Sequence, residues 1–161
     1  MIRIGYGNDI HRLSSGERLV LAGVDIDSDL GAIGHSDADA LTHAVTDGIL
    51  GALALGDIGQ HFSDGEQRWK NAESFVFLRY AVGLMKEHGY AIANVDSTVS
   101  LERPKLRPYI EQMRENLAQA LEVETNRVSV KAKTGEEVDA VGERRAIRAE
   151  AVVLLSKDVQ L

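Results

Sequence analysis

The stretch from His35 to Ala52, HSDADALTHAVTDGILGA, constrains the fold most, because its second half reads as a helix with two unlike faces. Apolar residues recur at the spacing of a buried helical stripe, namely Leu41, Val45, Gly48, Ile49 and Ala52. On roughly the opposite side, Asp39, His43 and Asp47 follow one another at intervals of four residues. The pattern predicts a helix that packs on a core and carries a row of titratable side chains.

The start of this helix also carries residues that suit a metal site. Asp37 and Asp39 are good N-cap residues, and His35 and Ser36 lie in the loop just before the helix. If His43 gives one ring nitrogen to a metal ion, we expect a neighbour such as Asp47 to hold the other ring N–H. A polar helix face in water explains the same pattern, and the helix alone does not decide between the two.

Composition bounds the class of protein. A chain of 161 residues, 44% hydrophobic and 27% charged, is long enough for one domain with a real core, and we expect a single domain over residues 1–161. The sequence contains no cysteine, so any metal is held by nitrogen and oxygen, as in catalytic zinc sites. A formal charge of −7 argues against nucleic acid as a partner.

The same composition bears on location. No apolar run approaches the roughly 20 residues that a membrane span needs. No signal peptide is evident, because the first residues read as a strand, although a removed leader would leave the same start. We therefore expect a cytoplasmic protein, with a plastid location after loss of a transit peptide as the alternative.

A second cluster of metal-ligand types ends the first strand. Residues 2–11 read as extended chain, in which Asp9 and His11 point to the same side because the side-chain period is two. Their Cα atoms would lie roughly 6.5–7 Å apart, close enough for both side chains to bind one ion. Together with His43 they make three ligands, which leaves the fourth position of a zinc ion open.

The rest of the chain alternates between the two periodicities. Further helices are expected at residues 71–88 and 109–121, and further strands at residues 95–101, 128–130 and 149–155. Residues 19–24 are expected to form a short strand or a hairpin partner. The last strand is nearly all apolar, so we expect it to be central in the sheet or at an interface. The fold class is therefore α/β (α+β) with a small mixed β-sheet.

Several turns carry residues that could contact a ligand. Residues 56–59 offer exposed amides and a carboxylate for a polyol hydroxyl, although a helix C-terminal cap and turn explain them equally well. Residues 62–66 form a polar loop that could close over a ligand, and residues 102–108 a stiff basic turn at a strand end. Residues 131–136 suit phosphate and a second metal ion, or a solvated charged turn.

Six patches stand in one order along the chain: GYGNDIHRL, HSDADALTH followed by Asp47, LGDIG, FSD, ERPKL and VKAKTGE. Together they resemble the 2-C-methyl-D-erythritol 2,4-cyclodiphosphate synthases of the non-mevalonate isoprenoid pathway, and the similarity covers essentially the whole chain. The resemblance implies a homotrimer in which the sheets face the threefold axis, the helices lie on the other face, and the active sites lie between subunits.

The reaction implied by the resemblance is an intramolecular phosphoryl transfer catalysed by a phosphorus–oxygen lyase. The 2-phosphate of 4-diphosphocytidyl-2-C-methyl-D-erythritol 2-phosphate displaces CMP and closes 2-C-methyl-D-erythritol 2,4-cyclodiphosphate. In the family, ligands at the positions of Asp9, His11 and His43 hold one divalent ion per active site, usually zinc. Glu136 and substrate oxygens would hold a second ion, usually magnesium or manganese.

The resemblance also assigns the substrate contacts. His35 and Thr134 would position the phosphates and stabilise the transition state. Asp57 and Gly59 would hold the erythritol hydroxyls, and residues 101–107 with Lys133 would form the cytidine pocket of the adjacent subunit. The full set of implied substrate contacts is Asp9, His11, His35, Ser36, Asp57, Ile58, Gly59, Phe62, Asp64, Glu66, Leu101, Pro104, Lys105, Leu106, Arg107, Lys133, Thr134, Gly135 and Glu136.

The chain departs from the family pattern at several positions. Asn8 stands where an aromatic residue is common, Ala38 replaces a frequent glycine, and Lys133 replaces a threonine. The largest departure is GERRA at residues 142–146, where many members read Gly-Arg-x-Glu-Gly. The family holds an isoprenoid diphosphate in a central cavity near this segment. Here the cavity positions are Ala140 and Glu143, so we expect weak or absent binding of farnesyl diphosphate.

Two other functions remain open from the sequence. A metal-dependent phosphatase or nucleotide hydrolase could use the same ligands, but it needs an activated water and a positioned base. A non-catalytic metal- or isoprenoid-binding trimer would keep the ligands and lose turnover.

Overall fold

The computed structural model describes residues 1–63, 67–69 and 72–157. Its main sheet has five strands in the order β4-β1-β7-β5-β6. The strands are β1 (Ile2–Ser14), β4 (Gly31–Ala32), β5 (Ala91–Ser100), β6 (Val128–Lys133) and β7 (Ala146–Ser156). Only β5 and β6 pair in parallel, and the other pairs are antiparallel. The predicted mixed sheet is confirmed.

The smaller elements refine the predicted boundaries. The stretch predicted as a short strand or hairpin partner over residues 19–24 belongs to a hairpin of β2 (Leu19–Leu21) and β3 (Val24–Ile26). The loop that was expected to follow it contains β4, which pairs with the end of β1. The short helices are α2 (Ile58–His61), α5 (Asp139–Gly142) and the 3-10 turns at Gln67–Trp69, Arg107–Tyr109 and Thr125–Arg127.

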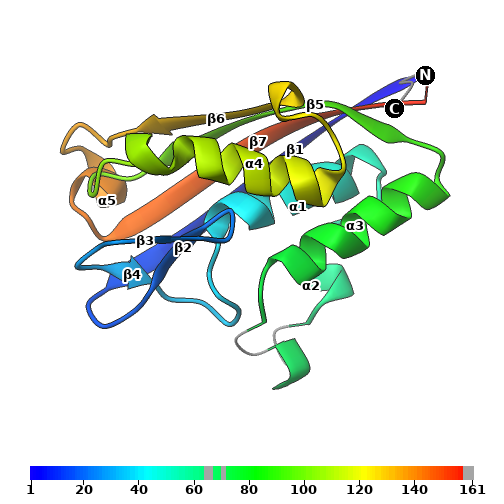
Figure 1. Cartoon of the computed structure of the whole chain (residues 1–161). Coiled ribbons are helices and arrows are strands. Elements are labelled where there is room, and N and C mark those ends of the chain that lie inside the picture. Colours follow the sequence, from blue (N-terminus) through cyan, green and yellow to red (C-terminus); the bar gives the residue numbers. More distant parts are fainter. Residues whose placement is uncertain (64–66, 70–71, 158–161) are drawn as a thin grey trace.

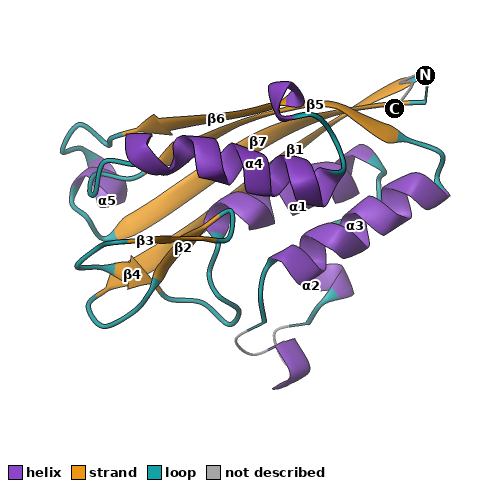
Figure 2. Ribbon diagram, in the orientation of Figure 1, coloured by secondary structure: helices purple, strands orange, loops and turns teal. Residues whose placement is uncertain are grey.

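Three longer helices form a second layer on one face of the sheet (Figures 1 and 2). They are α1 (Ala40–Ala52), α3 (Phe75–Glu87) and α4 (Ile110–Leu121). The helix predicted from Asn71 begins instead at Phe75, and Asn71 itself lies outside the described residues. None of the helices in the described ranges is long and apolar enough to cross a membrane.

The central strand β7 explains the apolar run near the end of the chain. It lies between β1 and β5, as its composition predicted. On the helix side its alternate residues are fully or almost fully buried, namely Ile147, Ala149, Ala151, Val153 and Leu155. The side chains of β1, which pairs with β7, alternate between the same two faces of the sheet. Every second residue of β1, including Asp9 and His11, therefore lies on the side that faces α1.

Helix α1 lies unusually close to β1 because the contact is made through glycines. A Cβ at Gly7 would lie 2.7 Å from the amide nitrogen of Gly48, and nearer still to the Ala44 carbonyl oxygen. Gly5 is equally tight against the backbone of α1. The glycines of the GYG patch thus set the distance between the strand and the helix.

The start of α1 is fixed by Asp39, which is completely buried. Its carboxylate accepts hydrogen bonds from the amide (3.0 Å) and the hydroxyl (2.8 Å) of Thr42. It also accepts from the amides of Ala22 (2.9 Å) and Gly23 (2.8 Å) in the hairpin turn. Burial raises the pKa of Asp39 and these donors oppose the rise. Asp39 is therefore a buried cap, not part of a polar helix face.

The opposite face of the sheet carries exposed apolar side chains. In the described part of the chain, no helix packs on this face (Figure 2). Ile4 is 68% exposed and Val152 is 45% exposed, and the group is completed by Ile2, Tyr6 and Ile10. Monomeric proteins rarely leave such a patch open to water, so this face is a candidate interface.

Candidate metal centre

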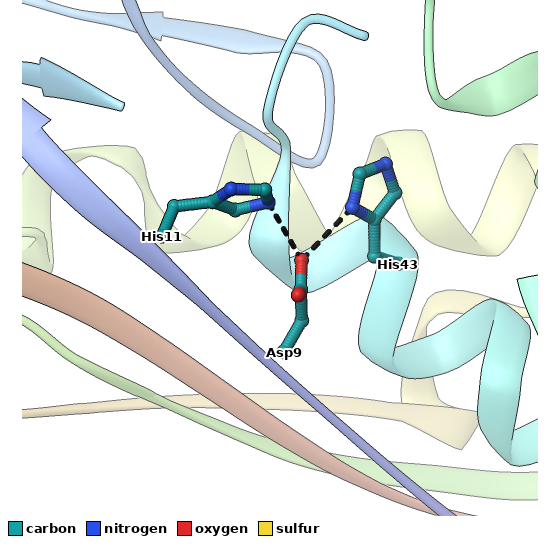
Figure 3. A group of neighbouring side chains, drawn as sticks. All are labelled: Asp9, His11 and His43. Atoms are coloured by element: carbon teal, nitrogen blue, oxygen red, sulfur yellow. Dashed lines mark hydrogen bonds and ion pairs between the residues drawn. The ribbon is translucent and has the colours of Figure 1, made fainter. Parts of the chain in front are cut away.

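Three side chains from two layers of the fold converge at one point (Figure 3). Asp9 and His11 come from β1, and His43 comes from the first turn of α1. Oδ2 of Asp9 lies 2.8 Å from Nε2 of His11 and 2.9 Å from Nδ1 of His43. One ligand atom from each residue lies within 4.8 Å of the others, so the group could hold a metal ion.

The ring nitrogens that point away from this centre have partners of their own. Nδ1 of His11 lies 3.0 Å from the Ile33 carbonyl oxygen, which can only accept, so this nitrogen carries the proton. In the neutral imidazole the lone pair is then on Nε2, which faces Asp9. Such an arrangement fixes the ring and presents a lone pair toward the centre.

His43 is held differently from the prediction. Its Nε2 lies 2.7 Å from the Ser74 hydroxyl and 3.2 Å from the Ser36 hydroxyl. The prediction that His43 donates to Asp47 is wrong. The Asp47 carboxylate accepts instead from the amide of Ile58 at 2.8 Å. Asp47 thereby ties α1 to the start of α2.

The electrostatics suit a cation. Burial alone would raise the pKa of Asp9, but the two imidazoles beside it hold that pKa well below its usual range. Burial alone would lower the pKa of His43, but Asp9, with the charges of Asp39 and Asp37, raises it. The carboxylate is thus ionised at neutral pH.

One further observation tests whether an ion fits. Nε2 of His11 is buried and makes no well-aligned hydrogen bond, although Asp9 lies 2.8 Å away. A buried nitrogen without an aligned donor is costly unless something else uses its lone pair. Three ligand atoms within 4.8 Å of one another, one of which lacks an aligned hydrogen bond, fit a shared metal ion.

These residues open into a pocket of about 240 Å³. Its lining comprises Asp9, His11, His35, Ser36, His43, Asp47, Ile58, Gly59, Phe62, Trp69 and Phe77. A groove of about 630 Å³ between α3, α4 and the β2–β3 hairpin is larger. The chemistry identifies the smaller pocket as the site, because the Asp–His–His group lies there.

The aromatic wall of the pocket was not predicted. The ring of Phe77 lies 6.1 Å from that of His43 and 4.7 Å from that of Phe62, and Trp69 lies 5.0 Å from Phe62. Only Phe62 was singled out from the sequence. Phe77 and Trp69 carry no polar motif, and their role depends on how α3 packs against α1.

Of the other residues expected to contact the substrate in this pocket, some line it and others do not. Ile58 and Gly59 lie on its wall. Asp57 is the N-cap of α2 and accepts from the Gln60 amide at 3.0 Å, whereas the alternative interpretation had been a C-terminal helix cap. Asp64 and Glu66 lie outside the described residues.

The second group of expected site residues lies elsewhere in the chain. Asp9 pairs with Ala149 of β7, while Lys133 ends β6, three strands away from β1. That spacing is roughly 14 Å across the sheet. The Thr134 hydroxyl donates to Glu136 at 2.9 Å, so these two residues contact one another and not the Asp–His–His group.

The basic turn lies beside this second group. The Gly135 amide donates to Glu102 at 2.9 Å. Pro104 and Lys105 line a groove of about 570 Å³, while Leu101 and Leu106 are buried. Arg107 is exposed at the start of a 3-10 turn. One chain therefore contains two separate halves of the expected site.

Residues 142–146, the segment that departs most from the family pattern, form ion pairs within the chain. Arg145 binds Glu143 at 2.6 Å, and Arg144 binds Asp29. Glu143 is thus paired within its own chain, while Ala140 leaves the neighbouring position small. Weak binding of farnesyl diphosphate at this segment stays a prediction.

Fold and site together define a class: a mixed α/β protein with an Asp–His–His centre between its sheet and its first helix. The family model described as the YgbB family matches residues 2–156. The chain belongs to the YgbB family.

Relatives and solved structures agree with this assignment. A 2-C-methyl-D-erythritol 2,4-cyclodiphosphate synthase from Solibacter usitatus is 53% identical, over 97% of this chain and 98% of the relative. A solved structure of such a synthase in a CDP-bound form has a TM-score of 0.89 and 41% identity, covering 96% of this chain and 100% of the other. The CDP complex of IspF from Plasmodium falciparum has a TM-score of 0.85 and 37% identity, covering 96% and 95%.

Proposed function

We propose that this protein is an enzyme that converts 4-diphosphocytidyl-2-C-methyl-D-erythritol 2-phosphate to 2-C-methyl-D-erythritol 2,4-cyclodiphosphate and CMP. The observation that carries the proposal is the Asp9, His11 and His43 centre in a pocket of a chain that is 53% identical to a synthase of that name. In this proposal zinc occupies the centre, and magnesium or manganese is held by Glu136 with the substrate diphosphate.

The chain's own residues would act mainly by positioning. Asp9, His11, His43 and Glu136 would hold the ions, which would supply charge neutralisation at the phosphoryl group that is attacked. His35 and Ser36 lie on the pocket wall beside the centre, where they can orient phosphate oxygens. No general base is needed, because the attacking phosphate is already ionised at neutral pH. Phosphoryl transfer of this kind depends on geometry and charge more than on covalent chemistry.

A homotrimer with shared sites is part of the proposal. Two features support it: the exposed apolar face of the sheet, and the separation of Thr134 and Glu136 from the Asp–His–His group of the same chain. Packing three copies by this face would bury Ile4 and Val152 and let one subunit's second group approach another's first. The lyase class and a cytoplasmic location, which the bacterial relatives favour, also belong to the proposal.

Phosphorus NMR tests the activity directly. The cytidine-linked 2-phosphate substrate is incubated with enzyme, Zn²⁺ and Mg²⁺. We expect cyclic diphosphate and CMP in equal amounts. Inorganic phosphate instead would establish a hydrolase, and an unchanged substrate with zinc bound would establish a non-catalytic protein.

Subunit mixing tests the shared site. Asp9→Ala removes a centre ligand, and Lys105→Glu reverses a charge in the groove of the second group. If each site draws one half from each of two subunits, mixed trimers regain some complete sites and some activity. No recovery after proven subunit exchange would contradict a composite site.

A further inference from the structure

Ser74 occupies the N-cap of α3 without using its side chain as a cap. It is completely buried, and its hydroxyl makes no hydrogen bond to the first turn of its own helix. Serine is favoured at this position because its oxygen usually accepts from such an amide. The hydroxyl is instead turned toward α1, which indicates that it is engaged elsewhere.

Its two partners are a histidine and a carboxylate. The Ser74 oxygen lies 2.7 Å from Nε2 of His43 and makes a short hydrogen bond to the Asp37 carboxylate. The Ser74 amide donates to the other Asp37 oxygen at 3.0 Å. Asp37 is itself tied to the same loop, since its amide donates to the Ala72 carbonyl at 3.1 Å.

The chemistry of these groups fixes where the protons lie. An ionised carboxylate only accepts hydrogen bonds, and a hydroxyl has a single proton. Ser74 therefore donates to Asp37 and accepts from Nε2–H of His43. With its proton on Nε2, the imidazole can present the Nδ1 lone pair to the centre that Asp9 and His11 share.

We propose that Ser74 and Asp37 are positioning residues of the metal centre, which fix the tautomer and the orientation of His43. The proposal rests on the proposed function in one respect, that an ion binds at Asp9, His11 and His43. Ser74 plays for His43 the part that the Ile33 carbonyl plays for His11. Partners of this kind commonly affect metal affinity by 10–100-fold.

The Ser36 hydroxyl is a weaker candidate for the same role. It lies 3.2 Å from Nε2 of His43, against 2.7 Å for Ser74, and it accepts from the Ala38 amide at 3.3 Å. No carboxylate sets the direction of its proton among the hydrogen bonds of the described residues. Ser74 is therefore the principal partner.

Zinc affinity of the purified full chain, measured by competition with a chromophoric chelator, tests the proposal. Ser74→Ala removes the acceptor. Asp37→Asn keeps the shape but offers an N–H to Ser74, which favours the opposite proton order and places a proton on Nδ1 of His43. We expect each variant to bind zinc about 10–100-fold more weakly than the parent.

A matched control is available in Ser97, another buried serine with one well-formed hydrogen bond. Ser97 lies on β5, away from the pocket, and its hydroxyl donates to the Ser129 carbonyl at 2.8 Å. Ser97→Ala is expected to lower stability while leaving zinc affinity within twofold of the parent. This comparison separates loss of a buried hydroxyl from loss of the contact to His43.

Nitrogen-15 NMR of the zinc-loaded protein gives a readout that a purely structural role would not change. In the parent protein the proton on Nε2 of His43 should be shifted far downfield and protected from exchange. Both variants should move it upfield or lose it. If Ser74→Ala does not fold, the isosteric Asp37→Asn decides the question.

The outcomes distinguish the two proposals. Parent-like zinc affinity and an unchanged Nε2–H signal in folded variants would overturn the positioning role while leaving the proposed function intact. Failure of the parent to bind zinc would overturn the metal centre and, with it, the role of Ser74. Zinc binding that depends on Ser74, without cyclisation, would support the positioning role and refute the activity.

Discussion

Gly7→Ala should disturb the metal centre although it removes no functional group. The new Cβ would lie 2.7 Å from the Gly48 amide nitrogen and closer to the Ala44 carbonyl oxygen. Ordinary contacts of this kind need about 3.5–4 Å, so α1 must retreat from β1 by more than about 1 Å. That movement carries His43 away from Asp9 and His11, whereas metal–ligand distances tolerate only about 0.2 Å.

We expect Gly7→Ala to lower the free energy of unfolding by about 1–3 kcal/mol, the usual cost of overpacking. Zinc affinity should fall at least about tenfold. Gly83→Ala is the control, because a Cβ there meets nothing within 4 Å on a helix of the same layer. It should stabilise the protein by roughly 0.5–1 kcal/mol. Denaturant titration and chelator competition measure both quantities, and parent-like values for Gly7→Ala would refute the reasoning.

Four further predictions follow from the site and the exposed face. Asp9→Ala should abolish cyclisation in the NMR assay with the trimer intact by size-exclusion chromatography, and loss of the trimer would show a structural role. Glu136→Gln should raise the Mg²⁺ or Mn²⁺ requirement, because it removes charge and keeps shape, and unchanged metal dependence would contradict its assigned role. Ile4→Glu should dissociate the trimer, because Ile4 is 68% exposed on the proposed interface, and an unaltered elution volume would argue against that interface. In the metal-free protein burial lowers and Asp9 raises the pKa of His43, with a net rise. The stabilisation from this pair is therefore complete below about pH 6.5 and is lost as pH rises through the raised value. Zinc must displace that proton, so its affinity should increase over the same range, and a flat profile would contradict the assignment.

Periodicity predicted the elements whose burial follows a regular pattern. The buried stripe of α1 could be predicted because Leu41, Val45 and Ile49 all lie in the hydrophobic core and are fully buried. The central position of β7 followed from its apolar composition. The same-side placement of Asp9 and His11 followed from the strand period alone.

Contacts between segments that are distant in the chain could not be predicted from the sequence. Asp39 reads as part of a polar face until the amides of Ala22 and Gly23 are seen to bind it. Asp47 has the right spacing to contact His43, but its carboxylate accepts a hydrogen bond from the Ile58 amide instead. The sequence pattern placed the helix start at Asn71 and did not single out Ser74, whose hydroxyl contacts His43 only because α3 packs against α1.

The uncapped start of α3 has a kinetic consequence. Its first amides, those of Val76 and Phe77, donate to the carbonyls of Glu73 and Ser74 in a tight turn, without a side-chain acceptor. Local opening of such a turn has its own free energy, which can lie below the global free energy of unfolding. Both Ser74 and Phe77 contact the ring of His43, so opening of this one turn would loosen a ligand while the sheet stays folded. We therefore expect zinc release to a chelator to follow amide exchange at the start of α3 and not global unfolding.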